Sequence, residues 1–162
     1  MVTRSAGVLL TRVGPDGGME VLLGHPGGPF FARRDDGAWS IPKGEYFPEE
    51  DSRAAAAREF TEELGAPPPP GPEWDLGEVR LPSGKRLIVY AVRADFDASE
   101  VHGNTFELEW PPKSGRRQSF PEIDRAEWFD LDTARRKLAR GQAEFLDRLL
   151  TVAPDKPAAQ TP

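Results

Sequence analysis

Apolar residues along the chain gather in short runs divided by glycine- and proline-rich stretches, a pattern typical of strands joined by turns. The runs at 5–12 and 19–24 are almost continuously apolar, so we expect two strands that are buried on both faces of a sheet. The segment 14–18 between them, Gly-Pro-Asp-Gly-Gly, has the residues of a hairpin turn. Segments 74–81 and 85–94 predict a second hairpin around a Pro-Ser-Gly turn.

The second half of the chain predicts one further strand and two helices. Residues 124–130 read as a strand, while 131–139 and 142–152 read as helices separated by a glycine. The stretch 101–112 has no clear period. The last residues, 153–162, carry prolines and no periodicity, so we expect a disordered tail there. Strands enclosed by helices on two sides favour an α/β/α sandwich.

The middle of the chain predicts a helix with clear ends. Asp51 or Ser52 is a good N-cap, and the alanines at 54–57 are the best helix formers. Gly65 suits the left-handed residue that ends a helix, and the prolines at 67–70 prevent its continuation. The sequence therefore predicts a short helix that is bounded on both sides.

This predicted helix has an apolar stripe and a structured approach. Ala57, Phe60 and Leu64 lie at i, i+3 and i+7 and form its expected buried face. Upstream, 39–44 is expected to be a short extended piece that ends in a glycine turn, because Pro42 is incompatible with a central strand. We therefore expect an extended piece, a glycine turn and a loop ahead of the helix.

Three glutamates crowd another face of the helix. Glu59, Glu62 and Glu63 stand at i, i+3 and i+4, a spacing that places their carboxylates together. Like charges at this spacing destabilise a helix by about 0.2–0.5 kcal/mol per pair, so a positive charge is expected between them. The nearest cation, Arg58, lies one residue off this face. A hard divalent ion that takes oxygen ligands, Mg²⁺ or Mn²⁺, is the expected occupant.

A solvated, salt-bridged helix face is the alternative interpretation of the same glutamates. Such a face alternates Glu with Lys or Arg at i and i+4. Here the one pair of that kind is Arg58–Glu62, in the less favourable order. The pattern therefore favours a metal site.

The acidic helix and the segment ahead of it match a known motif: Gly, five residues, Glu, seven residues, then Arg-Glu-apolar-x-Glu-Glu-x-Gly-apolar. The match is made by Gly44, Glu50, Arg58, Glu59, Phe60, Glu62, Glu63, Gly65 and Ala66. This pattern resembles the Nudix box, and its one soft departure is Ala66, which is smaller than the usual aliphatic residue. Resemblance to the Nudix hydrolases implies an α/β/α sandwich with a mixed β-sheet, and metal-dependent cleavage of a phosphoanhydride.

The resemblance also implies roles for the residues of the box. The implied metal ligands are Glu59, Glu62, Glu63 and the backbone carbonyl of Gly44. Arg58 would belong to the catalytic machinery by holding Glu59 in place, and Glu50 would support the helix from its N-terminal side. Mg²⁺ is the implied cofactor, with Mn²⁺ as a substitute. Such ions polarise a diphosphate and lower the pKa of a bound water.

The general base varies within this family, and the box alone leaves it open. Glu59 is one candidate. Glu122 is the second, because several relatives that act on nucleoside polyphosphates carry a glutamate a few residues ahead of the same final aromatic strand. Glu107 and Glu109 are weaker candidates, and we expect them to be surface residues because glutamate is seldom buried.

Positively charged residues near the box are candidates for binding the substrate. Lys43 immediately precedes the glycine of the box, where a substrate phosphate would approach. Arg33 and Arg34 lie in a loop that could close over the site, with solvated loop charges as the equal alternative. His25 and His102 have no ligand spacing, so we expect neither to be a metal ligand or a catalytic base.

Composition agrees with a single enzyme domain, expected over residues 1–152 of the 162. The absence of cysteine excludes disulfides and thiolate metal sites and favours a reducing, cytoplasmic compartment. No apolar run has the length needed to span a membrane. The net charge of −6 argues against binding of duplex nucleic acid, without excluding a nucleotide or the phosphorylated end of an RNA. Nothing in the sequence indicates an oligomeric state.

The lead-in to the box, residues 39–45, bears on the choice of substrate. It resembles the lead-in of Nudix enzymes that hydrolyse diadenosine tetraphosphate and diphosphoinositol polyphosphates. The wider chain resembles a bacterial group of nucleoside triphosphate pyrophosphohydrolases. We therefore expect hydrolysis of a nucleoside polyphosphate, with dinucleoside polyphosphates favoured. The alternatives are hydrolysis of damaged nucleoside triphosphates, removal of pyrophosphate from RNA 5′ ends, and a module that binds a nucleotide without turnover.

Overall fold

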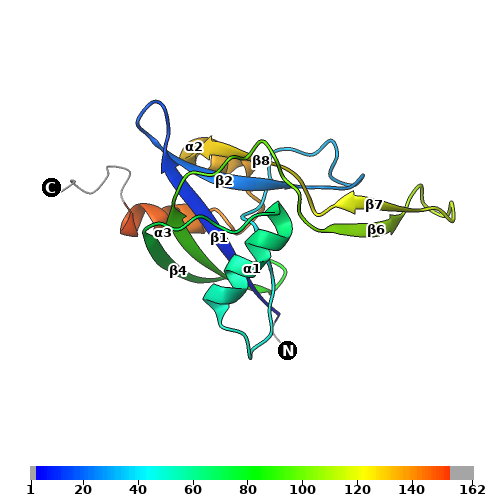
Figure 1. Cartoon of the computed structure of the whole chain (residues 1–162), viewed down its shortest axis with the longest axis horizontal. Helices are drawn as coiled ribbons and strands as arrows, with labels where there is room; N and C mark the ends of the chain where they lie inside the picture. Colours follow the sequence, from blue (N-terminus) through cyan, green and yellow to red (C-terminus); the bar gives the residue numbers. More distant parts are fainter. Residues whose placement is uncertain (1–2, 154–162) are drawn as a thin grey trace.

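A computed structural model describes residues 3–153 as a central sheet with helices on both faces and a projecting two-stranded arm (Figure 1). The elements follow in the order β1 (Arg4–Val13), β2 (Met19–Pro26), β3 (Lys43–Glu45), α1 (Ser52–Leu64), β4 (Glu73–Arg80), β5 (Arg86–Arg93), β6 (Thr105–Glu109), β7 (Arg117–Pro121), β8 (Ile123–Asp130), α2 (Leu131–Lys137) and α3 (Glu144–Val152). Both predicted hairpins, β1–β2 and β4–β5, are confirmed, and so is the strand β8. The last two helices are each shorter than predicted.

The central sheet is mixed, as expected. Its strands follow the order β4-β5-β1-β2-β8, and β3 adds to β1 beside this path. The pairing of β1 with β5 is parallel, whereas the pairings of β1 with β2 and β3, of β2 with β8 and of β4 with β5 are antiparallel. The strand β1 therefore lies at the centre of the fold, with partners on both edges.

Side chains of β1 alternate between two apolar clusters. Val8 and Leu10 join the cluster that contains Phe60 of α1, while Leu9 joins the cluster that contains Phe145 of α3 and residues of α2. Because successive residues of a strand point to opposite faces, this division places α1 on one face of the sheet and α2 and α3 on the other. Burial on both faces and the α/β/α sandwich are confirmed.

One edge of β1 serves two partners in turn. Residues 5–7 pair with β3, and residues 11–13 pair with β2. Between these two pairings, the Val8 N–H donates a 3.2 Å hydrogen bond to the Pro42 carbonyl. The expectation of a glycine turn at Gly44 is therefore wrong, because Gly44 lies inside β3. Pro42 is compatible with this arrangement because it stands just before the strand and removes no ladder hydrogen bond.

The caps of α1 form as predicted, and Asp51 is the residue that acts as N-cap. Its side chain accepts a 3.0 Å hydrogen bond from the Ala54 N–H. Gly65 ends the helix in the left-handed conformation, with φ of 88°. The buried stripe differs from the prediction in one residue, since Ala57 is half-buried and residues 55–56 are buried instead. The helix therefore meets the sheet along a row with four-residue spacing.

The strands β6 and β7 form a two-stranded arm that the sequence did not predict. Their antiparallel pairing runs from Thr105 opposite Pro121 to Glu109 opposite Arg117. Figure 1 shows the arm projecting from the body of the molecule. An isolated two-stranded ribbon is marginally stable, and aromatic contacts support this one. The ring centroids of Phe30 and Trp110 are 5.5 Å apart, and those of Phe106 and Phe120 are 6.0 Å apart.

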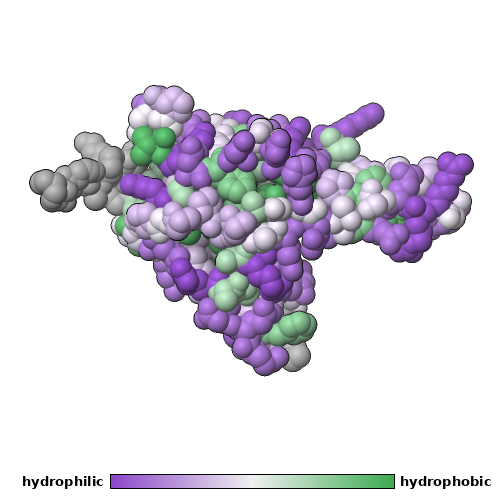
Figure 2. All heavy atoms as spheres, viewed as in Figure 1, coloured by the Kyte–Doolittle hydropathy of each residue, from purple (hydrophilic) through white to green (hydrophobic). Residues whose placement is uncertain are grey.

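The predicted tail at 153–162 lies outside the described residues, except for Ala153, which is buried in the cluster with α3. Across residues 3–153, no helix combines the length and apolarity that a membrane crossing requires. Hydrophilic residues cover most of the molecular face seen in Figure 2.

Candidate functional site

The glutamate face of α1 lies against β3, at the position of Gly44. A Cβ built on Gly44 would stand 1.8 Å from Oε1 of Glu59, so a side chain fits here only if the Glu59 carboxylate moves away. Gly44 is held in place by its pairing with Ala6 of β1. The packing of α1 on the sheet thus presses a carboxylate against the backbone of β3.

Glu63 is anchored at the same junction. Its Oε1 accepts a 3.2 Å hydrogen bond from the backbone N–H of Lys43. Burial raises the pKa of the Glu63 carboxyl to about 8, and the nearby charges of Glu59 and Glu122 add to this rise, while Lys43 opposes it. The positive charge beside Glu63 is therefore too small to offset its burial and its acidic neighbours.

One guanidinium serves three of the carboxylates. Arg58 lies 3.1 Å from Glu50, 2.9 Å from Glu59 and 3.2 Å from Glu62. Burial raises the pKa of Glu59, and the charge of Glu62 raises it further, while Arg58 lowers it. The predicted contact between Arg58 and Glu59 is present, and Glu50 reaches the same arginine from ahead of the helix.

A pocket of about 420 Å³ adjoins this cluster; Glu59, Glu62 and Glu63 line it, whereas Glu50 and Arg58 do not. Its lining consists of Ser5, Lys43, Gly44, Glu45, Glu59, Glu62, Glu63, Lys85, Asn104 and Glu122. Glu122 reaches the pocket from the junction of β7 and β8, where its N–H donates a 2.9 Å hydrogen bond to the Asn104 carbonyl. The structure thus places Glu59 and Glu122, the two candidates for the general base, at one cavity.

The donor set of this pocket fits a hard divalent cation, although its carboxylates are not arranged around a single point. Among residues 3–153, no three Asp, Glu, His or Cys side chains converge in a geometry ready to hold an ion. Oxygens of Glu59 and Glu62 are turned toward Arg58 instead. Glu62 is 38% exposed and can change rotamer at little cost, so the pocket has both the carboxylate oxygens and the room that an ion needs.

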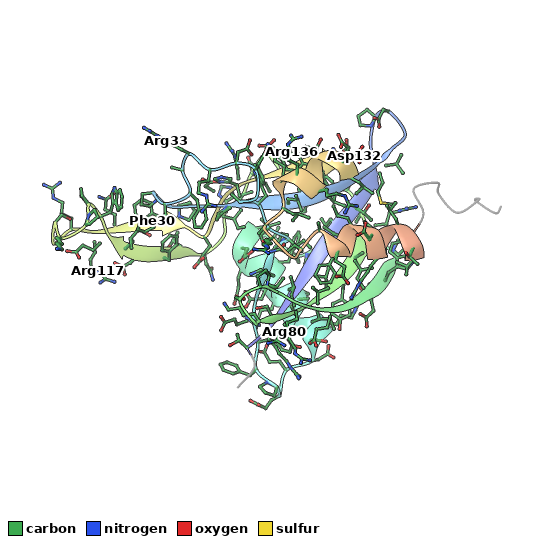
Figure 3. The ribbon with its side chains drawn as sticks, turned by 180° about the vertical axis from the view of Figure 1, so that it is seen from behind. Phe30, Arg33, Arg80, Arg117, Asp132 and Arg136 are labelled. Atoms are coloured by element: carbon green, nitrogen blue, oxygen red, sulfur yellow. The ribbon has the colours of Figure 1, made fainter. Side chains whose placement is uncertain are left out.

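The predicted phosphate-binding residues divide into two groups. Lys43 lines the pocket, and burial lowers the pKa of its ammonium group, while the Glu63 charge opposes this shift. Arg33 and Arg34 do not line it. Figure 3 shows Arg33 extending away from the body, and the Arg34 guanidinium lies over the Phe31 ring at 5.4 Å. A role for these two arginines in binding substrate stays a prediction.

Sequence reasoning missed three polar residues of the pocket that come from distant segments: Ser5 of β1, Lys85 and Asn104. Lys85 enters from the turn between β4 and β5, and Asn104 enters from the base of the arm. No local spacing relates either residue to the box. The one sequence feature that bears on Lys85 is the predicted β4–β5 hairpin, which places this residue at the end of a strand.

The two histidines and the weaker general-base candidates, Glu107 and Glu109, lie outside the pocket. His25 is buried, with Nδ1 at 2.9 Å from Asp124 and Nε2 at 2.7 Å from the Arg34 carbonyl. His102 is exposed, and Glu107 and Glu109 are exposed on the arm. The exposed positions of Glu107 and Glu109 agree with the expectation that both belong to the surface, while the expectation that neither histidine ligates a metal stays a prediction.

A family model described as "NUDIX domain" matches residues 1–149 of the chain. The match covers the helix, the sheet and every residue of the pocket. No curated protein sequence matches the chain.

Several solved structures have the same fold. The NUDIX domain of Shewanella oneidensis NrtR, solved with ADP ribose, is 16% identical, with a TM-score of 0.64 over 93% of this chain and 88% of that one. An Ap4A hydrolase of C. elegans is 20% identical, with a TM-score of 0.59 over 93% of this chain and 96% of that one. The Nudix hydrolase RenU of M. smegmatis is 25% identical, with a TM-score of 0.54 over 97% and 90% of the two chains.

Proposed function

Because this chain belongs to the NUDIX family of pyrophosphohydrolases, we propose that it hydrolyses a nucleoside polyphosphate with the help of Mg²⁺. The favoured substrate is a dinucleoside polyphosphate. The observation that carries the proposal is the pocket between α1 and β3, where three glutamates of α1 and Glu122 of the β7–β8 junction line the same cavity as two lysines. Family enzymes use divalent cations, and Mg²⁺ is the member of that group that suits carboxylate and phosphate oxygens.

The box glutamates, Gly44 and Glu122 have defined parts in this proposal. Glu59, Glu62, Glu63 and the Gly44 carbonyl would hold the cation, which supplies charge neutralisation at the phosphoryl oxygens and acidifies a bound water. Glu59 or Glu122 would accept the proton of the attacking water, since both carboxylates line the cavity.

The positively charged neighbours complete the site. Arg58 orients Glu59 through a 2.9 Å ion pair, so it acts as a positioning residue. Lys43, at the wall of the pocket, would donate hydrogen bonds to a phosphate oxygen. Together these residues would bind and orient a diphosphate.

The preference for a dinucleoside polyphosphate rests on two likenesses. The segment 39–45 resembles the lead-in of enzymes that act on such compounds. The C. elegans protein with the same fold is an Ap4A hydrolase. Damaged nucleoside triphosphates and RNA 5′ ends remain the alternative substrates, and nucleotide binding without turnover is the remaining alternative function.

A substrate screen tests the proposal. The protein is incubated with diadenosine tetraphosphate, the nucleoside triphosphates, ADP-ribose and capped RNA in the presence of Mg²⁺, and the released products are measured. We expect the highest kcat/KM for diadenosine tetraphosphate and complete loss of turnover with a chelator, reversed by Mg²⁺. Tight nucleotide binding without turnover of any compound would favour a binding module and overturn the proposal.

A further inference from the structure

Lys85 is a positive charge of the pocket to which the sequence assigned no role. It immediately precedes β5, and the hairpin fixes its backbone: the Lys85 carbonyl accepts a 2.8 Å hydrogen bond from the Leu81 N–H, and its N–H donates to Ser83 Oγ at 3.3 Å. Its ammonium group is therefore attached to an ordered turn at the edge of the pocket.

The strand order brings Lys85 to the same edge as β3. Ser5 of β1 pairs with Glu45 on one side and with Leu87 of β5 on the other. Lys85 lies two residues before Leu87, and its Nζ reaches across β1 to Oε2 of Glu45, at 3.1 Å. Ser5, Glu45 and Lys85 all line the pocket, so this ion pair forms part of its rim.

The ion pair between Lys85 and Glu45 is easily exchanged. The two side chains are 43% and 62% exposed, and exposed pairs of this kind contribute little to stability. An incoming phosphate offers Lys85 a stronger partner, because a phosphate carries more charge and more acceptor oxygens than one carboxylate. Glu45 therefore competes with a phosphate for Lys85 and costs the protein little when it is displaced.

The distribution of charge in the pocket suggests a role for Lys85 in binding substrate. Cations held by the α1 glutamates neutralise the phosphates that are being cleaved, whereas a longer polyphosphate places further negative charge beyond that cluster. We propose that Lys85 binds the phosphates of the substrate that lie outside the metal cluster, and that Glu45 weakens this binding by competition. This inference rests on the proposed function and adds a residue that favours long polyphosphates.

Two substitutions with opposite expected effects test the inference on diadenosine tetraphosphate. Lys85→Gln should raise KM by about tenfold, the effect expected for one hydrogen bond to a charged group, with kcat unchanged. Glu45→Gln should lower KM, because it removes the competitor. The double variant should behave like Lys85→Gln alone, because Glu45 acts through Lys85.

The neighbouring pair provides a matched control. Arg86 is also 43% exposed and pairs with Glu78 at 3.3 Å, but neither residue lines the pocket. Arg86→Gln should leave KM and kcat at their wild-type values. A rise in KM in Arg86→Gln equal to that in Lys85→Gln would overturn the inference, since it would show a general effect of surface charge.

A titration calorimetry experiment with inorganic tripolyphosphate and Mg²⁺ provides a readout that needs no turnover. We expect Lys85→Gln to weaken binding by about the same tenfold factor. An unchanged KM and an unchanged affinity would overturn the role of Lys85 and leave the proposed function standing. Failure of the wild-type protein to hydrolyse any polyphosphate would overturn the proposed function, and the titration would then decide the role of Lys85 alone.

Discussion

Two groups of acidic residues on opposite faces of the sheet differ in how their carboxylates are paired with positively charged side chains. Beside α2, Asp35 accepts hydrogen bonds from Lys137 at 2.6 Å and from the Trp39 ring N–H at 2.8 Å. Asp36 lies 3.2 Å from Arg136, which Figure 3 shows on α2. Each of these carboxylates has a cation of its own, and the Lys137 hydrogen bond, followed by that of Trp39, lowers the pKa of Asp35.

In the pocket beside α1 the balance is reversed. Arg58 is shared by three carboxylates, and the pKa values of Glu59 and Glu63 are raised by burial and by neighbouring carboxylates. Paired charges of the first kind are common on protein surfaces, whereas crowded carboxylates with raised pKa values indicate a functional site. The comparison teaches that too few positive charges for the number of carboxylates, and not the presence of carboxylates itself, distinguishes the site beside α1 from the group beside α2.

Removing one carboxylate from the crowded group should have the largest effect. Glu62→Gln keeps the size of the side chain and loses a proposed metal ligand, so kcat should fall by about a thousandfold, the loss expected for several kcal/mol of transition-state stabilisation. The fold should be retained, because the change relieves a like-charge contact. Steady-state kinetics and circular dichroism measure the two effects.

The control for this variant is Glu49→Gln, which changes an exposed glutamate ahead of α1 that does not line the pocket. Its activity should equal that of the wild type. Near-normal activity of Glu62→Gln would show that the metal assignment is wrong, and the contrast between the two acidic groups would lose its functional meaning.

A methyl group at Gly44 should disturb the crowded group without removing a charge. Gly44→Ala places a Cβ where the Glu59 carboxylate lies, so Glu59 must move, and a displacement of this size costs about a hundredfold in kcat/KM. Gly44 does not have a positive φ, so the substitution adds no backbone strain of that kind. Kinetics with diadenosine tetraphosphate measure the loss.

Gly18→Ala is the matched control, since the nearest atom to its Cβ would be Asp16 Oδ1 at 3.4 Å and its φ is not positive. We expect this control to retain full activity. Full activity in Gly44→Ala as well would mean that the position of Glu59 against β3 has no part in the reaction.

The smallest effect is expected in the matched group. Lys137→Met removes the cation that serves Asp35 and keeps the apolar length of the side chain. The unfolding temperature should fall by less than about 4 °C, and kcat and KM should not change, because Asp35 is 54% exposed and would keep its hydrogen bond from the Trp39 ring N–H. Differential scanning calorimetry measures the unfolding temperature, and steady-state kinetics measure kcat and KM. A changed KM would show that this group is coupled to the pocket, against the prediction.

Local rules account for the parts of the fold that were predicted well. The helix α1 begins after Asp51 and ends before Gly65 because capping depends on residues within one turn of each end. The spacing of Glu59, Glu62 and Glu63 is likewise a property of the helix itself. These features needed no knowledge of distant contacts.

Predictions were wrong or missing where long-range pairing decides. Gly44 lies in a strand and not in a turn, because the free edge of β1 accepts β3. The arm from Thr105 to Pro121 was missed because its two strands pair only with each other and mix exposed polar with half-buried apolar residues. The strand β6 does carry the period-two alternation of a strand over its five residues, but β7 has no such alternation, so the sequence did not indicate that the two segments pair.

The sequence by itself determined the acidic helix, its ends and the family to which the chain belongs, since these depend on residues a few positions apart. Only the tertiary structure decided that Lys85, Asn104 and Glu122 meet that helix at one pocket. The physical reason is that side chains from distant segments are brought together by strand order and register, which hydrogen bonds across the whole sheet establish.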